Sequence, residues 1–548
     1  DYLRRVVVNF FRSKEEEKWK KIVLKRKLMD ASIKDIEILK ELLDNPNIDV
    51  NLQDKNRWTA LIHASSEGHT EIVKELLHNP NIDAALMWAC SKGHTEIVKE
   101  LLQHPNIDVN KQNKNGWTAL IWASKEGHTE IVKELLQHPE INVNLQDKDG
   151  WTALMDASNE GHTEIVKELL KHPDIDVNKQ NKEGTALMWA CSKGHTEIVK
   201  ELLQHPDIDV NKQNKDGFTA LMVAHSKGHT EIVKELLKHS DIDVNKQNKN
   251  GFTVLMWACY KGHTEIVKEL LDNPEINVNL QDKNGFTALM VACFKGHIEI
   301  VKELLDNPNI DVNKQSVHGI ALMNRGMTAL MCACNEGNTK IVKELLKYSK
   351  IVVNKGDEIG MTALIHACLK GYTEIVKELL RDHDCNVNVQ DGYGYTALIH
   401  ACLKEKTEIV KELLQHPNID VNKQLKNGCT VLIYAYLKGH IEIVKELLGH
   451  RKINVNIQNN DGSTLLIDSC KKGQIDVVKK LLQHPKINVN LQDEKGWTAL
   501  LYAFKDIEIV KELIKHPKID LNIQYKDGGT ALSKAYYYSN RSQKHKEI

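Results

Sequence analysis

The sequence predicts an all-α repeat solenoid in which short β-hairpins join pairs of helices. A block of 34 residues recurs through most of the 548 residues. Each block holds two short helix-like segments, followed by an extended "IDVN" and a "DG" or "NG" turn. One such block cannot bury its apolar faces alone, so successive blocks must stack on one another. We expect a stack of about fifteen units.

The start of each block is marked by a threonine, usually followed by "AL". Thr59 and the pseudo-start Ala84 precede the regular series, which gives fifteen starts, the last of them incomplete. The step is 34 residues almost throughout, and 33 before Thr185. The regular series is Thr118, Thr152, Thr185, Thr219, Thr253, Thr287, Thr328, Thr362, Thr396, Thr430, Thr464, Thr498 and Thr530.

The first helix of a block follows this threonine. With the threonine as position zero, positions +2, +5, +6 and +9 are Leu, Ala, mostly Cys, and Gly. At about 100° per residue these positions fall in one sector, which we expect to be buried. Position +4 points about 150° away from that sector, so we expect it to be exposed.

The second helix, "TEIVKELL", has Ile, Val and Leu on one face and Glu and Lys on the other. We expect the apolar face to be buried and the charged face to be solvated. The proline of "QHPDIDVN" stops this helix, because proline continues a helix poorly. The extended "IDVN" and the following turn are typical of a β-hairpin.

The pattern "G-[WF]-T-A-L…G-H-T-E-I-V-K-E-L-L…D-V-N" resembles the ankyrin repeat over residues 28–535. The resemblance implies that the first helices and hairpins line a concave groove that holds a partner protein. The chain departs from the family pattern "TPLH", because "TAL" followed by Ile or Met removes a proline and a histidine. A tetratricopeptide array has the same repeat length, but the "GH" turn and the "DVN" segment argue against it.

We divide the chain by the continuity of the repeat. A basic leader with a net charge of +5 over residues 1–30 is expected to form a capping helix. Binding of this leader to a membrane surface or a partner is the alternative. The divisions are a leader (1–27), a degenerate capping repeat (28–57), a first repeat block (58–315) with a skipped hairpin near 79–90, an extended hairpin insertion (316–326), a second repeat block (327–529), and an incomplete repeat with a tail (530–548).

Aromatic residues are scarce, at 5% of the chain, and two positions collect them. One is position +4; the other is the residue just before the threonine, called here the loop position. Large aromatic side chains at exposed positions commonly anchor partner proteins. Packing between neighbouring hairpins is the alternative for the loop position. The predicted partner-binding residues are Trp88, Trp122, Trp189, Trp257 and Tyr434 at position +4, and Trp58, Trp117, Trp151, Phe218, Phe252, Phe286 and Tyr395 at the loop position.

Catalytic, metal and cofactor sites are not predicted. His366 and His400 share position +4 in adjacent units, but stacked helices lie about 8–10 Å apart, too far for one zinc ion. The cysteines at position +6 are expected to be small buried side chains, and the "GH" histidines to make structural hydrogen bonds. Phosphate-binding and nucleophile motifs are absent from the sequence, and its paired carboxylates recur in every unit, whereas a catalytic pair should be singular.

The leading functional hypothesis is a non-enzymatic scaffold that binds partner proteins in the cytoplasm, with association to a cytoskeletal assembly as an extension. With 74 basic and 75 acidic residues, the chain has no net charge to attract nucleic acid, and no apolar run is long enough for a membrane span. No small-molecule substrate is expected. Two alternatives stay open: the ankyrin arm of a larger enzyme, channel or effector, and an elastic structural rod.

Overall fold

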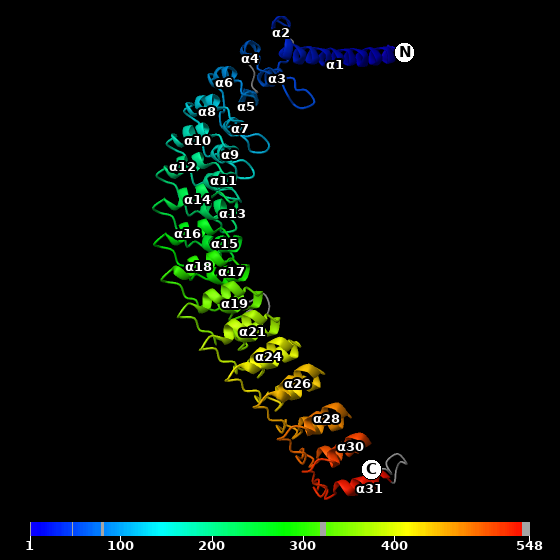
Figure 1. The fold of residues 1–548 in the computed structure, drawn as a ribbon. Helices are drawn as coiled ribbons and strands as arrows, with labels where there is room; N and C mark the ends of the chain where they lie inside the picture. The colour runs from blue at the N-terminus through cyan, green and yellow to red at the C-terminus, as the bar shows by residue number, and fades with distance from the viewer. Residues whose placement is uncertain (1, 46–47, 78–81, 318–324, 540–548) are drawn as a thin grey trace. The chain divides into compact units, whose positions relative to one another are not determined.

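The computed structural model describes residues 2–45, 48–77, 82–317 and 325–539, and it consists of helices joined by loops (Figure 1). The described residues form two compact units. The first comprises residues 1–258 and 268–276, and the second comprises 259–267 and 277–548. No helix among the described residues has the length and apolar character needed to cross a membrane.

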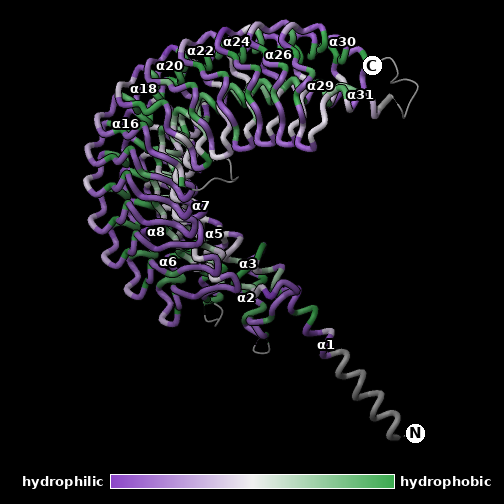
Figure 2. The backbone as a smooth tube through the Cα atoms, turned by 90° about the horizontal axis from the view of Figure 1, so that it is seen from below, coloured by the Kyte–Doolittle hydropathy of each residue, from purple (hydrophilic) through white to green (hydrophobic). Residues whose placement is uncertain are grey.

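Helices alternate between two layers in each unit. Within a compact unit, most first helices pack on the next first helix, and most second helices pack on the next second helix. Hydrophobic residues recur along the helices, and the loops are mainly hydrophilic (Figure 2). The first helices are α3 (Ala60–Glu67), α5 (Ile82–Lys92), α7 (Ala119–Glu126), α9 (Ala153–Glu160), α11 (Ala186–Lys193), α13 (Ala220–Ser226), α15 (Val254–Lys261), α17 (Ala288–Lys295), α19 (Ala329–Glu336), α21 (Ala363–Lys370), α23 (Ala397–Leu403), α25 (Val431–Leu437), α27 (Leu465–Lys471), α29 (Ala499–Ala503) and α31 (Ala531–Ser539). The second helices are α2 (Ile36–Leu43), α4 (Thr70–Leu76), α6 (Thr95–Leu102), α8 (Thr129–Leu136), α10 (Thr163–Leu170), α12 (Thr196–Leu203), α14 (Thr230–Leu237), α16 (Thr264–Leu271), α18 (Ile298–Asp306), α20 (Thr339–Leu346), α22 (Thr373–Leu380), α24 (Thr407–Gln415), α26 (Ile441–Gly449), α28 (Ile475–Leu482) and α30 (Ile507–Ile514).

The repeated threonine and glycine set the ends of the first helix. In α7 the Thr118 hydroxyl accepts the backbone N–H of Ile121 at 3.2 Å, as an N-cap does. Gly127 ends the helix with φ +83°, a left-handed conformation that favours glycine. A Cβ on Gly127 would lie 2.7 Å from the ring of His162 in the next repeat. The His162 ring in turn lies 2.9 Å from the carbonyl oxygen of Lys125. The predicted structural role of the "GH" histidines is therefore confirmed at this junction.

The buried face of the first helix is wider than the helical wheel predicted. In α9, positions +1, +2, +3, +5 and +6 are all buried. The second helix buries its Ile, Val and first Leu, as in α10. The extra burial at position +3 arises because each first helix lies between two neighbouring first helices and one second helix.

The predicted β-hairpins are wrong for the described residues, which contain no strand and only one isolated bridge, between Gln424 and Thr430. The "DVN" segment turns instead of extending, because the Asp108 carboxylate accepts the N–H of Asn110 at 3.1 Å. Side-chain amides replace the missing ladder between adjacent loops. The Gln112 amide donates to the carbonyl oxygens of Gly116 at 2.8 Å and of Gln146, in the next repeat, at 2.9 Å.

The leader and the degenerate first repeat share one helix, α1 (Tyr2–Lys34). Leu28, Ala31 and Ser32 near its end are buried, and α1 packs there on α2 and α3. Further back, Trp19 is 65% exposed, so among described side chains the leader packs on the stack only near its C-terminal end. Three predicted features lie outside the described residues at 78–81, 318–324 and 540–548: part of the skipped hairpin, most of the insertion, and the tail.

Candidate functional site

The loop position is held by a tight turn that begins five residues before the threonine. In one such turn the Asn113 side-chain oxygen accepts the backbone N–H groups of Asn115 at 2.8 Å and Trp117 at 3.1 Å. Gly116 between them has φ +84°, and a Cβ there would lie 2.8 Å from the backbone nitrogen of Lys148 in the next loop. In the repeats that carry an aromatic residue at the loop position, the turn thus places its side chain at the base of the loop, beside the start of the first helix.

The structure brings the two predicted aromatic positions together. Residues 58–257 are called here the tryptophan segment. Within it, each +4 tryptophan contacts a loop aromatic of its own repeat or of the preceding repeat. Such offset and tilted ring pairs add stabilisation beyond their buried area. The centroid distances are 4.4 Å for Trp58–Trp88, 4.3 Å for Trp117–Trp122, 4.4 Å for Trp151–Trp189, 5.4 Å for Phe252–Trp257 and 6.1 Å for Phe218–Trp257.

The prediction that position +4 is exposed needs correction. All twelve predicted partner-binding residues, including Phe286 at its loop position, are partly buried, and none is fully exposed. The helical-wheel prediction considered the first helix by itself, whereas in the structure the loop aromatics cover much of the +4 side chains. At Trp189 the burial extends to the indole nitrogen, which has no hydrogen-bond acceptor among the described residues. A positive charge lies beside one of these partly exposed rings, because the Lys125 ammonium is 4.4 Å from the centroid of the Trp117 ring.

A different chemistry occupies the same positions in residues 357–502, called here the acid-paired segment. His366 lies 3.1 Å from a carboxylate oxygen of Asp357, and both side chains are buried. In the next unit His400 lies 2.8 Å from Asp391. The same pairing recurs where the Tyr502 hydroxyl donates to Asp493 at 2.6 Å and, at the start of the tryptophan segment, where His63 lies 3.2 Å from Asp54.

The two predicted tyrosines also meet in this segment. The rings of Tyr395 and Tyr434 lie 6.1 Å apart, and their hydroxyl oxygens are 3.3 Å apart. The hydrogen bond with Tyr395, together with burial, raises the pKa of Tyr434 to about 12. The Tyr434 hydroxyl therefore stays protonated near neutral pH and acts as a hydrogen-bonding group.

Sequence reasoning missed the residue five positions before the threonine. It is Asp where position +4 is His63, His366, His400 or Tyr502, and Asn where position +4 is Trp122 or Trp257. The exceptions are Asp147 and Asp282, whose +4 residues are Asp156 and Val291. This correlation between the two positions could have been found in the sequence. A buried carboxylate needs a hydrogen-bond donor, which histidine or tyrosine at position +4 supplies and tryptophan does not reach to supply.

No metal or thiol chemistry emerges from these positions. His366 and His400 are each engaged by the acid of their own repeat. Within the described ranges there is no cluster of three or more potential metal-ligating side chains. All eleven cysteines are free and buried, and burial raises the pKa of the Cys191 thiol. Their predicted role as small core side chains is confirmed.

Comparison with known proteins identifies the family. A family model described as ankyrin repeats, in three copies, matches residues 28–113, 86–181, 173–248, 240–316, 317–391, 383–459 and 439–527. No curated protein matches the chain. The count of fifteen units stays a prediction. Because the matched stretches follow one another from residue 28 to residue 527, the chain belongs to the ankyrin repeat family.

Proposed function

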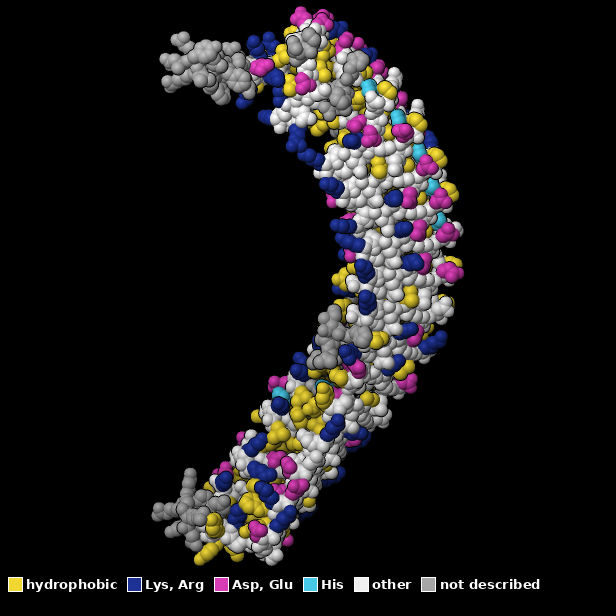
Figure 3. Space-filling view, turned by 180° about the vertical axis from the view of Figure 1, so that it is seen from behind, with side chains coloured by type: hydrophobic (Ala, Val, Ile, Leu, Met, Phe, Trp, Pro, Cys, Tyr) yellow, Lys and Arg dark blue, Asp and Glu magenta, His cyan; other side chains and the backbone are white. Residues whose placement is uncertain are grey.

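We propose that this chain is a non-enzymatic scaffold that binds partner proteins through the surface formed by its first helices and loop tips. Ankyrin repeats generally mediate interactions between proteins, and this family membership supports the proposal. Its surface mixes both signs of charge: basic and acidic side chains lie interspersed on the face drawn in Figure 3. Such a mixture favours a protein partner over nucleic acid, which attracts one sign of charge.

One observation carries the proposal: the partly exposed tryptophans of the tryptophan segment. Tryptophan is enriched among the residues that contribute most to protein–protein binding, because it combines a large apolar area with few rotatable bonds. Trp122, Trp189 and Trp257 stand in three repeats and stay partly open to solvent. At the same +4 position His366 is only 4% exposed. We therefore place the partner-binding residues in the tryptophan segment.

The test is a variant that removes the three indoles and keeps the fold. Valine is the suitable replacement, because Val223 and Val291 already occupy position +4 in other repeats. The triple variant Trp122→Val, Trp189→Val, Trp257→Val is compared with wild type in affinity capture from native lysate, read by mass spectrometry. The control is Trp19→Val, which removes an exposed tryptophan from α1.

We expect partners that are captured by wild type and by the control and lost from the triple variant at matched helicity and melting temperature. Equal capture by all three proteins would disprove the role of these tryptophans. The proposal includes no catalytic residue and no cofactor. Eleven reduced, buried cysteines support a cytoplasmic location, which fractionation of the cells that make the protein would check.

A further inference from the structure

A recurring ion pair joins neighbouring second helices at seven of the described junctions. The lysine of "TEIVKELL" in one repeat faces the glutamate that follows the lysine in the next repeat. Each pair is exposed and contributes little by itself, but the pairing keeps the charges along this face balanced. The described pairs are Lys40–Glu75, Lys74–Glu100, Lys99–Glu134, Lys167–Glu201, Lys234–Glu269, Lys343–Glu378 and Lys377–Glu412, at 3.2–3.9 Å.

At the junction between α26 and α28 the glutamate of this pattern is itself replaced. Its second helix reads "IDVVKKLL", so Lys480 stands where every other second helix has glutamate. Lys445 on α26 therefore faces a lysine across the junction. Lys445 pairs instead with Glu442 on its own helix at 2.5 Å. Lys480 makes no ion pair within the part of the chain that the structure describes, which leaves one uncompensated positive charge here.

The same junction is also held open. Position +6, which carries Ser, Cys or His in the preceding repeats, carries Tyr436 here, and its side chain is 6% exposed. Helices α25 and α27 pack much more loosely than α27 and α29, and α26 and α28 make almost no direct contact. A phenol ring is far larger than a thiol, so Tyr436 keeps the two repeats apart where a cysteine would let them close.

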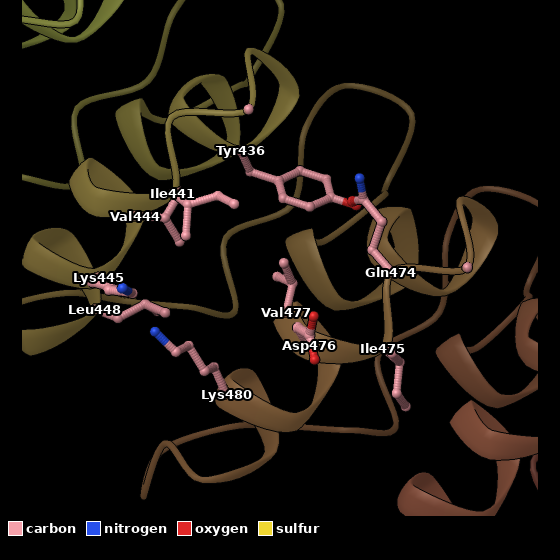
Figure 4. Close-up of a pocket in the computed structure, with 12 residues that line it drawn as sticks. Tyr436, Ile441, Val444, Lys445, Leu448, Gln474, Ile475, Asp476, Val477 and Lys480 are labelled. Atoms are coloured by element: carbon pink, nitrogen blue, oxygen red, sulfur yellow. The ribbon is translucent and has the colours of Figure 1, made fainter.

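The result is a cleft of about 450 Å³ between α26 and α28 (Figure 4). Its wall includes Ile441, Val444, Leu448 and Val477, and Ile441 is 64% exposed. Lys480 extends toward the end of the cleft near Lys445 and Leu448, and the Tyr436 ring lies toward the other end (Figure 4). One carboxylate, that of Asp476, also lines the cleft, and Lys445 is already paired with Glu442, so Lys480 is the lining lysine that has no ion-pair partner among the described residues.

We propose that this cleft binds a segment of a partner protein that presents a large apolar side chain next to an acidic one. The apolar side chain lies against Ile441, Val444 and Val477, and the acidic side chain takes the place of the missing glutamate opposite Lys445, beside Lys480. Charge complementarity selects the partner, because this is the one described junction where two lysines replace the Lys–Glu pair. The cleft lies on second helices, so it is separate from the first-helix surface proposed above.

The test is a peptide selection with a matched variant of the full chain. A random displayed peptide library is selected on wild type and counter-selected on Lys480→Glu, which restores the residue of all other second helices. The variant is expected to fold, because it gives Lys445 the glutamate partner found at the other junctions. We expect enriched peptides that combine Glu or Asp with Leu, Phe or Trp within one helical turn. Their affinity for Lys480→Glu should be about tenfold weaker, as loss of one charge-assisted contact predicts, and should fall with added salt.

A second variant, Tyr436→Cys, tests the cleft without changing its charge. It should let the repeats close and weaken the same peptides, while Tyr395→Phe, on another repeat, should leave them unaffected. Peptides without acidic residues, or peptides that bind both variants as tightly as wild type, would overturn the proposal. A Lys480-dependent dimer in sedimentation would also overturn the proposal, because it would assign the cleft to a second copy of the chain. Stabilisation of the protein by dodecanoate, with no enriched peptide, would overturn it too, because it would assign the cleft to a small amphiphile. Capture by the tryptophan segment is measured independently, so the two proposals fail separately.

Discussion

The tryptophan segment and the acid-paired segment use the same two positions for opposite purposes. In the first, position +4 carries an indole that packs on a loop aromatic, as Trp122 does on Trp117 at 4.3 Å, and stays partly exposed. In three repeats of the second, position +4 carries a polar ring that a buried acid satisfies, as Asp391 does for His400 at 2.8 Å. The scaffold is the same in both, and only the side-chain pair differs.

This difference shows how a repeat can change its surface without changing its fold. A buried polar group must be hydrogen-bonded, so a histidine at position +4 brings its own acid and is drawn into the core. A tryptophan carries one polar group, its indole N–H, and leaves apolar area at the surface. The choice at position +4 therefore decides whether a repeat leaves apolar ring area at the surface or buries a polar ring.

The largest expected effect comes from removing a buried acid. Asp391→Ala removes the acceptor for the backbone N–H groups of Tyr393 and Tyr395 and leaves His400 buried without its partner. We expect the local opening free energy to fall by about 3 kcal/mol, since an unsatisfied buried group adds to the lost bonds. Hydrogen exchange at the Tyr395 amide measures this opening.

The matched variant in the tryptophan segment is Asn248→Ala. Asn248 accepts only the loop N–H groups of Asn250 and Phe252, and its +4 partner is Trp257. We expect the local opening free energy, measured by hydrogen exchange at the Phe252 amide, to fall by roughly 1.5 kcal/mol, half the loss expected for Asp391→Ala. Equal losses in the two segments would mean that the histidine–aspartate bond contributes nothing. Asp391→Asn keeps the loop bonds and separates the two contributions.

An effect of comparable size but opposite sign is expected at Asp156. This carboxyl occupies position +4 within the tryptophan segment, is 5% exposed, and has one oxygen without a hydrogen-bond partner. Burial, with lesser contributions from Asp147 and Glu160, raises its pKa to about 7, although Lys125 opposes the shift. The folded protein therefore holds this proton at pH values where the unfolded chain has released it. Stability contributed at this site falls as pH rises from about 4 to about 7.

Asp156→Asn should thus stabilise the fold above neutral pH, by up to about 3 kcal/mol, and should change little at pH 4. Thermal unfolding across this pH range measures the effect. The control is Asp468→Asn at the same position in the acid-paired segment, where Asp468 accepts the Ser463 hydroxyl at 2.7 Å and lies 3.6 Å from Lys471. Asp468→Asn should destabilise the fold, because it weakens these two contacts. A stabilising Asp468→Asn would contradict the explanation from burial.

The sequence predicted the helices, their caps and the core because each depends on nearby residues. Thr118 begins α7 through a local hydrogen bond, and Gly127 ends it through the φ angle that glycine favours. The spacing of the apolar residues alone selects the buried face. The strand prediction failed because adjacent loops are joined by the Gln112 amide and by a single backbone bond, from the Lys148 N–H to the Asn115 carbonyl, instead of by a ladder. The exposure of Trp122 was overestimated because the covering ring lies outside its own helix. These features depend on contacts between repeats, which a single-helix wheel does not contain.

The smallest expected effect is an acid sensitivity in the second unit. The rings of His416, His450 and His484 accept backbone N–H groups two residues ahead, at 3.2–3.3 Å. Accepting at Nδ1 requires that nitrogen to be unprotonated, and partial burial lowers the pKa of each ring below its usual 6.5. A lowered folded pKa means that this contribution is complete above pH 6.5 and is lost as pH falls through the folded pKa. Each loop should lose less than about 1 kcal/mol.

The matched change is histidine to asparagine at these three positions. Asn307 already occupies the equivalent position after α18, where its side-chain oxygen accepts the N–H of Asn309 at 3.0 Å. The triple asparagine variant should therefore keep the loops closed and remove their response to acid. Exchange rates of the Asn418, Lys452 and Lys486 amides, corrected for intrinsic pH dependence, should rise from pH 7 to pH 5 in wild type and stay level in the variant. A variant that opens as much as wild type would show that the acid response comes from other groups, such as the histidine–aspartate pairs of the acid-paired segment. Because asparagine cannot titrate, the experiment separates the hydrogen bond from the charge.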